Sequence, residues 1–193
     1  MTPARAFDTD TELMIQVQRE DAESFCVLLN RNRNVVVQYL SRVVQNQAIA
    51  EELAQDVFVR VYRSRRTYEP SAKFSTWLYR ITTNVALNHF RDGKKFQNHL
   101  SLDNQEFSQH LREIRDQALS AEGELLRQAV ALQVRRAIRS LPPKQRAAVI
   151  MHKYQELDYA QIGSILGCTP SSVKALMFRA YETLRMRLSY LQA

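Results

Sequence analysis

Residues 159 to 174 read YAQIGSILGCTPSSVK, and this stretch decides the fold of the C-terminal third of the chain. Gly167 favours the left-handed conformation that ends a helix, Thr169 is a residue type that caps the next one, and Pro170 suits a first helical turn, where its missing N–H group costs nothing. The pattern therefore predicts a helix, a tight turn and a second helix that begins at Pro170.

The second predicted helix has two different faces. An apolar stripe is expected to point into the core: Val173, Met177, Ala180 and Leu184. The opposite stripe carries small polar and basic side chains: Ser171, Lys174, Ala175, Phe178, Arg179 and Glu182. A helix that begins with hydroxyl groups and then presents Lys and Arg fits the major groove of DNA. An ordinary helical hairpin with a solvated basic face is the alternative, and the agreement of turn, cap, stripe and charge favours DNA binding.

The distribution of charge points to two contacts with a polyanion. The 193 residues carry a net charge of +7. Residues 124–193 hold 11 Lys and Arg against 4 Asp and Glu, whereas residues 1–123 hold 16 of each, so the whole excess lies in the C-terminal third. A second basic zone runs from Arg60 to Lys95, with nine basic residues against two acidic ones. Two separated basic zones suggest a polyanion touched at two places.

The remaining pattern predicts an all-α protein made of two small helical domains. Only four glycines occur, strand alternation is nowhere sustained, and apolar residues recur with the helical period. Helices are expected over 10–19, 22–44, 49–66, 75–92, 125–140, 143–154, 159–166 and 170–191. The polar composition between Gly93 and Gly123 predicts a flexible linker that carries one short helix over 105–119. The expected division is a first domain over 1–95, a linker over 96–124 and a second domain over 125–193.

The helix expected over 49–66 is acidic at its start and basic at its end. Its first half carries Glu51, Glu52, Gln55 and Asp56, and its last residues are mostly arginines. Part of this is complementarity to the helix dipole. Phe58 is expected to be more exposed than its size suggests, which would make the acidic end a protein-docking site.

A loop broken by Pro70 leads into the helix expected over 75–92, with Ser75 as its cap. Along that helix one side presents Arg80, Asn84 and Asn88 at helical spacing. The preceding loop adds three more candidates: Tyr68, Lys73 and Phe74. Amides flanked by basic and aromatic side chains can hold an unstacked base and its phosphates.

Several function classes find no support in the sequence. The four histidines have no metal-ligand spacing among themselves or with Cys26 and Cys168, and no glycine-rich phosphate loop occurs, so neither a metal, a cofactor nor an enzyme is expected. The two cysteines are expected to be buried, reduced thiols. No apolar run approaches the roughly 20 residues needed to span a bilayer, and the N-terminus lacks signal-peptide features. We therefore expect a cytoplasmic protein without membrane insertion.

Three motifs resemble those of one known family: EELAQDVFVRVY at 51–62, KFSTWLYRI at 73–81 with Asn84 beyond it, and LPPKQR at 141–146 ahead of the helix-turn-helix. In this order, over about residues 11–187, they are similar to the extracytoplasmic-function (ECF, group IV) sigma factors of the σ70 family of bacterial RNA polymerase. The resemblance implies a region 2 helical bundle and a region 4 helix-turn-helix. It also implies a dissociable subunit that binds core RNA polymerase and directs it to promoters. A one-component helix-turn-helix regulator is the alternative.

The resemblance assigns roles to three sets of residues. The clamp helices of the polymerase β′ subunit would be bound by Glu52, Gln55, Asp56 and Phe58. The minus 10 element would be contacted by Tyr68, Lys73, Phe74, Arg80, Asn84 and Asn88. The minus 35 element would be contacted by Thr169, Ser171, Ser172, Lys174, Ala175, Phe178 and Arg179.

Two further partners are implied, and one departure limits what can be transferred. Region 4 would also contact the β flap, and an anti-sigma factor is expected to cover the polymerase-docking surface. After Val173 and Lys174 the family usually has Ser-Arg, but here Ala175 and Leu176 follow. The minus 35 specificity therefore cannot be carried over from relatives, and methyl groups at this place could meet a thymine methyl.

Overall fold

The computed structural model describes residues 9–96 and 121–189, which form eight α-helices and one short 3-10 helix and contain no strand. The elements are α1 (Thr9–Gln18), α2 (Ala22–Val44), α3 (Gln47–Arg63), η1 (Arg65–Thr67), α4 (Phe74–Phe96), α5 (Ala121–Arg139), α6 (Pro143–Tyr154), α7 (Tyr159–Leu166) and α8 (Pro170–Leu188). Every helix expected in the described ranges is present, so the all-α class is confirmed.

Some helix ends differ from the expected ones for local reasons. The helix α3 ends at Arg63, because the chain tightens into the 3-10 turn η1. The helix α4 begins one residue early, so Ser75 lies inside the first turn and is not the cap. In addition, α4 continues to Phe96 and α5 starts at Ala121, so these two helices extend into both ends of the polar stretch between Gly93 and Gly123. The short helix expected over 105–119 lies outside the described residues.

The N-terminal half is a bundle of α1 to α4. Asp21 caps α2 by accepting hydrogen bonds from the backbone N–H groups of Glu23 and Ser24. The Ser24 hydroxyl also donates to this carboxylate at 2.7 Å, and these bonds lower the pKa of Asp21. At the centre of the bundle the buried hydroxyl of Tyr39 pairs with that of Thr83 at 2.8 Å. Burial raises the pKa of Tyr39, so its hydroxyl remains protonated at neutral pH.

The C-terminal half comprises α5 to α8, with α6 at its core. Five consecutive residues of α6, Ala147 to Met151, are buried. The helices α7 and α8 pack against each other and against α6, with Ile162, Ile165, Val173 and Met177 all at most 1% exposed. The apolar stripe expected on α8 is therefore correct, with Leu184 partly buried at its end.

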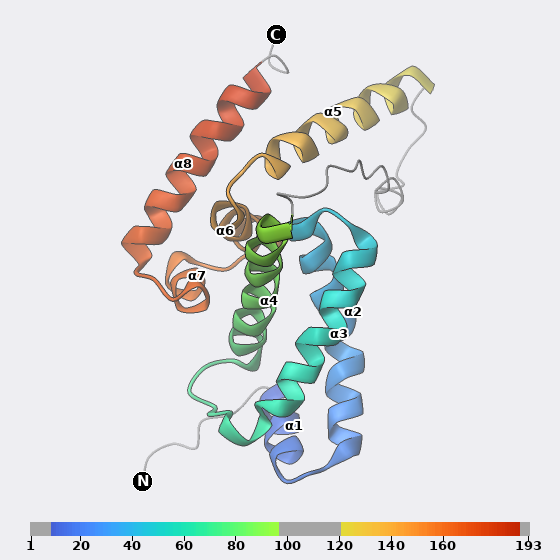
Figure 1. Ribbon diagram of the computed structural model, residues 1–193, viewed down its shortest axis with the longest axis vertical. Helices are drawn as coiled ribbons and strands as arrows, with labels where there is room; N and C mark the ends of the chain where they lie inside the picture. The colour runs from blue at the N-terminus through green and yellow to red at the C-terminus, as the bar shows by residue number, and fades with distance from the viewer. Residues whose placement is uncertain (1–8, 97–120, 190–193) are drawn as a thin grey trace.

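The two halves are in contact along α4. Figure 1 shows α4 at the centre, with α2 and α3 on one side and α6 and α7 on the other, and each of these four helices packs against α4. The helix α2 also contacts α6. The described parts of the two halves therefore share one continuous cluster of buried side chains.

Three other features bear on the sequence-based expectations. Cys26 is exposed on α2 and Cys168 is half-buried, both as free thiols, so the expected burial is wrong for Cys26. Within the ranges 9–96 and 121–189, no helix is long and apolar enough to cross a membrane. The same ranges hold no group of three His, Cys, Asp or Glu side chains that could bind a metal ion.

Candidate functional site

The acidic start of α3 faces outward. Asn46 caps this helix by accepting from the Ile49 N–H at 3.0 Å. Leu53, Val57 and Val61 turn into the bundle, and the polar side chains on the other side of the helix are exposed. The exposed set contains three of the four residues assigned to docking: Glu52, Gln55 and Asp56. They form a polar edge on the outer surface of the N-terminal half.

The fourth docking candidate, Phe58, was expected to be exposed, but it is buried. Its side chain is only 6% exposed, because α2 packs over this face of α3. Phe58 instead lines an apolar groove of about 380 Å³ between α2 and α3. The other lining residues are Phe25, Leu29, Arg33, Glu51, Ala54, Gln55, Val59, Tyr62 and Arg63. Phe58 therefore contributes to this surface from within the groove.

The groove contains apolar residues that sequence reasoning did not select. Val59 and Tyr62 are 47% and 42% exposed, respectively. The Tyr62 ring stacks at a tilt on Phe25, with centroids 5.1 Å apart, and the Arg65 guanidinium lies 4.0 Å from the Tyr62 ring centroid. The sequence did contain a signal for this groove. Apolar residues at positions 54, 58, 59 and 62 flank the core stripe of α3, so the apolar face of this helix is wider than packing against one neighbouring helix requires.

The loop before α4 is built around an aromatic cluster. Tyr68 and Phe74 are 3% and 1% exposed. Tyr68 meets Trp77 edge to face at 4.9 Å between centroids, and Phe74 lies 5.8 Å from Trp77. Tyr68 and Phe74, both predicted to contact the minus 10 element, are therefore buried by their packing on each other and on Trp77, and their rings do not lie at the surface.

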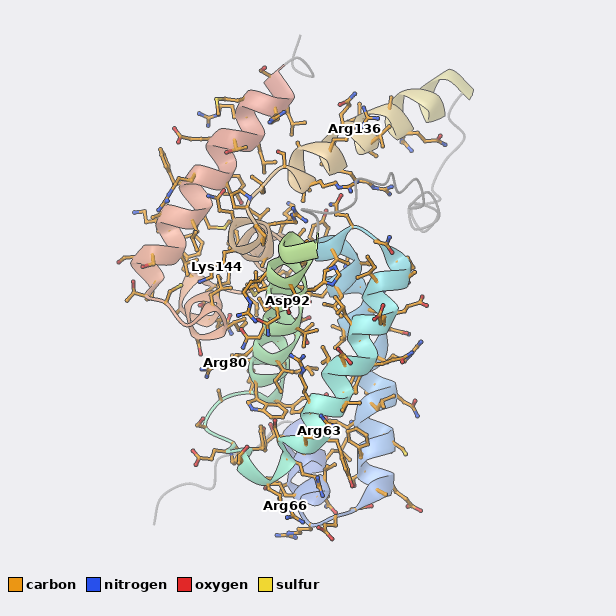
Figure 2. All side chains as sticks on the ribbon, in the orientation of Figure 1. Arg63, Arg66, Arg80, Asp92, Arg136 and Lys144 are labelled. Atoms are coloured by element: carbon orange, nitrogen blue, oxygen red, sulfur yellow. The ribbon has the colours of Figure 1, made fainter. Side chains whose placement is uncertain are left out.

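The outer side of the same loop is open and basic. Gln18 donates to the Tyr68 carbonyl at 2.7 Å and ties the loop to α1. Glu69, Ser71, Ala72 and Lys73 are exposed beyond this anchor. Figure 2 shows Arg63, Arg66 and Arg80 in the lower half of the view, from α3, η1 and α4. All three arginines are exposed, and Arg66 pairs with Glu20 at 2.9 Å.

The polar stripe of α4 follows the expected helical spacing. Arg80 and Asn84 are exposed and Asn88 is half-buried. The opposite side of the helix carries Leu78 and Val85, each 2% exposed. The core contacts of α4 therefore leave its amide and guanidinium groups available on the surface.

The turn between α7 and α8 has the predicted chemistry at each position. The helix α7 begins with a capping box, in which Asp158 and Gln161 exchange side-chain-to-backbone bonds of 2.8 and 3.0 Å. Gly167 ends it with φ 64°, a left-handed conformation. Thr169 then caps α8 by accepting from the Ser172 N–H at 3.2 Å. This hydroxyl is therefore already engaged in the fold before any DNA contact.

The start of α8 presents the remaining candidates at the surface. Ser171, Ser172, Lys174 and Arg179 are exposed, and Ala175 is half-buried. Phe178 is 64% exposed, which is unusual for a large apolar side chain. The Arg179 Nε donates to the Ala175 carbonyl at 3.4 Å, which leaves the terminal nitrogens of this guanidinium to other partners. The geometry suits a helix that enters a groove by its N-terminal end.

Comparison with known proteins identifies the family of the chain. Residues 28–96 match the family described as Sigma-70 region 2, and residues 131–184 match Sigma-70, region 4. The chain is 30% identical over 185 residues to the ECF RNA polymerase sigma-E factor of Haemophilus influenzae, covering 93% of this chain and 95% of that protein. This chain belongs to the ECF sigma factor family. The RNA polymerase sigma-H factor of Pseudomonas aeruginosa is 28% identical over 179 residues, 92% of each chain.

A solved structure agrees with the fold of this sigma factor. The structure of CnrH in complex with the cytosolic domain of CnrY superposes with a TM-score of 0.66 at 19% identity, over 95% of this chain and 99% of that one. The sequence-based assignment to the ECF family is thus confirmed, and the alternative of a one-component regulator is not supported. Sigma factors of this family are transcription initiation factors, not enzymes.

Proposed function

We propose that this sigma factor binds core RNA polymerase through α3, recognises the minus 10 element through α4 and its preceding loop, and recognises the minus 35 element through α8. The observation that carries the proposal is that three separate helices hold the corresponding polar side chains out of the core. Asp56, Asn84 and Lys174 are exposed, one on each helix, while their neighbours in sequence build the bundle. The protein has no catalysis of its own and acts in the cytoplasm.

Docking combines a polar edge with the apolar groove beside it. Glu52, Gln55 and Asp56 supply charge complementarity, which sets orientation and the rate of encounter. The floor of the groove includes Phe58 and adds apolar surface, which is removed from water when the β′ clamp helices bind there. Both parts lie on one face of α3, so a single helical partner can contact them together.

The minus 10 contact is assigned to exposed groups, and the buried rings shape the loop that carries them. Lys73, Arg80, Asn84 and Asn88 supply cations for phosphates and amides for base edges. Tyr68 and Phe74 hold the loop against the start of α4 through their packing on Trp77.

The minus 35 contact is assigned to the first turns of α8, and the β flap to the same half of the protein. Ser171, Ser172 and Lys174 lie at the end of the helix that approaches base edges, with Thr169, Ala175, Phe178 and Arg179 around them. An apolar groove of about 560 Å³ runs further along α8, lined by Phe178, Tyr181, Glu182, Leu184, Arg185 and Leu188. This groove is the place where we expect the β flap to bind.

An anti-sigma factor is the expected regulator. A sigma factor of similar fold, RpoE from Bartonella quintana, was solved in complex with the anti-sigma factor NepR, which supports a partner of this kind here. Such a partner would act by covering the α2–α3 groove and thereby excluding core polymerase.

Binding to core polymerase tests this proposal. Purified chain is mixed with core RNA polymerase and the complex is separated by size-exclusion chromatography. We expect stoichiometric co-elution that excess anti-sigma factor, or excess of another sigma factor, prevents. A chain that elutes alone at micromolar concentrations of both components would rule out the assignment.

A further inference from the structure

The loop assigned to the minus 10 element rests on α1, a helix to which no contact with DNA or polymerase is assigned. The match to Sigma-70 region 2 begins at residue 28, so α1 (Thr9–Gln18) lies outside it. Figure 1 shows α1 at the lower end of the bundle, beside the chain that leads from α3 into α4, and α1 packs against both η1 and α4. This helix is therefore placed to act on the loop from inside the protein.

Tyr68, where the loop begins, is bonded to α1 at both of its ends. Its backbone carbonyl accepts from the Gln18 side-chain amide at 2.7 Å, and its hydroxyl donates to the Thr11 hydroxyl at 3.4 Å. Thr11 and Gln18 are two helical turns apart, so both lie on the same side of α1. Tyr68 thus lies along this side of α1 and is buried there. We call Thr11 and Gln18 the α1 brace.

An ion pair holds the residues just before Tyr68 to the same corner of the bundle. The Glu20 carboxylate lies 2.9 Å from the guanidinium of Arg66 and 3.9 Å from that of Arg65. Glu20 has φ 69°, a left-handed conformation that is uncommon for a residue with a side chain. The pair with Arg66 is exposed and therefore adds little stability by itself. The short bond from Gln18 to Tyr68 is the stronger anchor.

The two ends of the loop meet next to the brace. The rings of Tyr68 and Phe74 lie 6.2 Å apart, edge to face, and both pack on Trp77. Residues 69–73 span the distance between these two rings, and Lys73 is exposed at the end of that span. Because Tyr68 is fixed to α1, the path of residues 69–73 depends on the brace.

We propose that Gln18 is a positioning residue for promoter melting, assisted by Thr11: by holding Tyr68, it keeps residues 69–73 in the shape that receives the unstacked base. This inference rests on the proposed minus 10 recognition and deepens it. A loop that is ordered before DNA arrives does not lose that conformational entropy during binding. Without the brace, the fraction of chains with a competent loop falls, and the apparent affinity for the melted strand falls by the same factor.

Two substitutions of Gln18 test the brace. Gln18→Met keeps the length of the side chain and removes the donor, and Gln18→Glu keeps the shape but cannot donate at neutral pH. Gln16→Met is the matched control, since Gln16 is exposed on the same helix. Circular dichroism and affinity for core polymerase should be unchanged in all three variants, because no docking residue belongs to α1.

The fluorescence of Trp77 reports the base of the loop directly. Trp77 is the single tryptophan of the chain, and its ring lies 4.9 Å from that of Tyr68. Acrylamide quenching in the free protein therefore measures how well Tyr68 covers it. Both Gln18 variants should be quenched more strongly than the wild type, and Gln16→Met should not.

Promoter melting is the functional readout. Each variant is combined with core polymerase on templates that the wild-type holoenzyme selects from a library of randomised upstream sequences, and permanganate reactivity measures the melted bases. The net contribution of one hydrogen bond corresponds to about threefold to tenfold in an equilibrium constant. Both Gln18 variants should reduce open-complex formation by about this factor at unchanged affinity for core polymerase, and Gln16→Met should melt the templates normally.

The outcomes separate positioning from other roles. Stronger quenching together with weaker melting, at unchanged helicity and core affinity, supports the brace. Normal melting would overturn it whatever the quenching, and weaker melting with unchanged quenching would overturn it in favour of a direct contact of Gln18 with DNA. A parallel loss of helicity, core affinity and melting would reduce Gln18 to a purely structural role. If the wild type itself melts no template, the proposed minus 10 recognition fails, and this inference fails with it.

Discussion

Gly163 in α7 lies directly against the carbonyl group of Cys168 in the turn that leads to α8. The Cys168 N–H donates to the Gly163 carbonyl at 2.9 Å, which folds the turn back over the helix. A Cβ atom on Gly163 would lie 2.6 Å from the Cys168 carbonyl oxygen, a backbone atom that cannot rotate away. The close approach of α7 to this turn therefore depends on a residue without a side chain, and with it the direction in which α8 leaves the turn.

The first prediction concerns this contact. Gly163→Ala should lower the free energy of unfolding of the C-terminal half by about 1–3 kcal/mol, because the backbone must shift to admit the methyl group. Thermal or denaturant unfolding measures the loss, and binding to minus 35 DNA should weaken with it. Gly93→Ala is the control, since Gly93 has no atom within 4 Å of the added Cβ and should be neutral or slightly stabilising. Equal stability of the two variants would contradict the role of Gly163.

The second prediction tests docking on α3. Asp56→Arg should weaken binding to core polymerase by a few kcal/mol if the contact is desolvated, while the fold loses under about 0.5 kcal/mol, because Asp56 is exposed. Glu12→Arg makes the same change at an exposed site on α1 and should bind normally. Phe58→Ala is a poor probe, since truncating a buried Phe costs about 3–5 kcal/mol of stability. Unchanged affinity of the helical Asp56→Arg variant would remove α3 from the interface.

The third prediction concerns promoter melting. Asn84→Ala and Lys73→Ala should impair open-complex formation more than core binding, because both side chains are exposed and are assigned to the unstacked strand. Permanganate footprinting of the minus 10 region reports the melted bases directly. Ser75→Ala, at another exposed position of the same segment, is the control. Normal melting with both variants would show that this surface is ordinary solvated helix and not a contact with the melted strand.

The fourth prediction separates two kinds of contact on α8. Lys174 lies nearer the helix start and should read a base, so Lys174→Ala should lose roughly 1–3 kcal/mol at one minus 35 position only. Arg179 should hold a phosphate, so Arg179→Ala should weaken binding to all sequences alike and reduce the salt slope by about one unit. Titrations on a set of minus 35 variants at two salt concentrations tell these effects apart. Two variants that bind every sequence like the wild type would exclude this helix from the DNA interface.

The sequence was most informative where structure depends on neighbours in the chain. The turn after α7 is predicted correctly at Gly167, Thr169 and Pro170, because a left-handed residue, a hydroxyl cap and a proline each act within a few residues. Periodicity likewise separates the buried stripe of α8 from its exposed stripe.

The burial of aromatic side chains was not predictable in the same way. Phe58, Tyr68 and Phe74 were all predicted to contact a partner, and all are buried: α2 packs over Phe58, and Tyr68 in the loop packs on Phe74 and Trp77 of α4. Whether an aromatic ring lies in a core or on a surface depends on such tertiary contacts, which periodicity does not report. The bond from Arg146 to Val43 joins residues 103 positions apart and leaves no local signal.

Run-off transcription tests the central claim most directly. Core RNA polymerase, with and without this chain, is presented with a library of randomised upstream sequences, and the transcribed templates are sequenced. We predict transcripts only when the chain is added, from templates enriched in two separate motifs, with Asn84→Ala changing use of the motif near minus 10 and Lys174→Ala that near minus 35. Transcription that is independent of the chain, or that shows no sequence preference, would contradict its role as a promoter-specificity subunit.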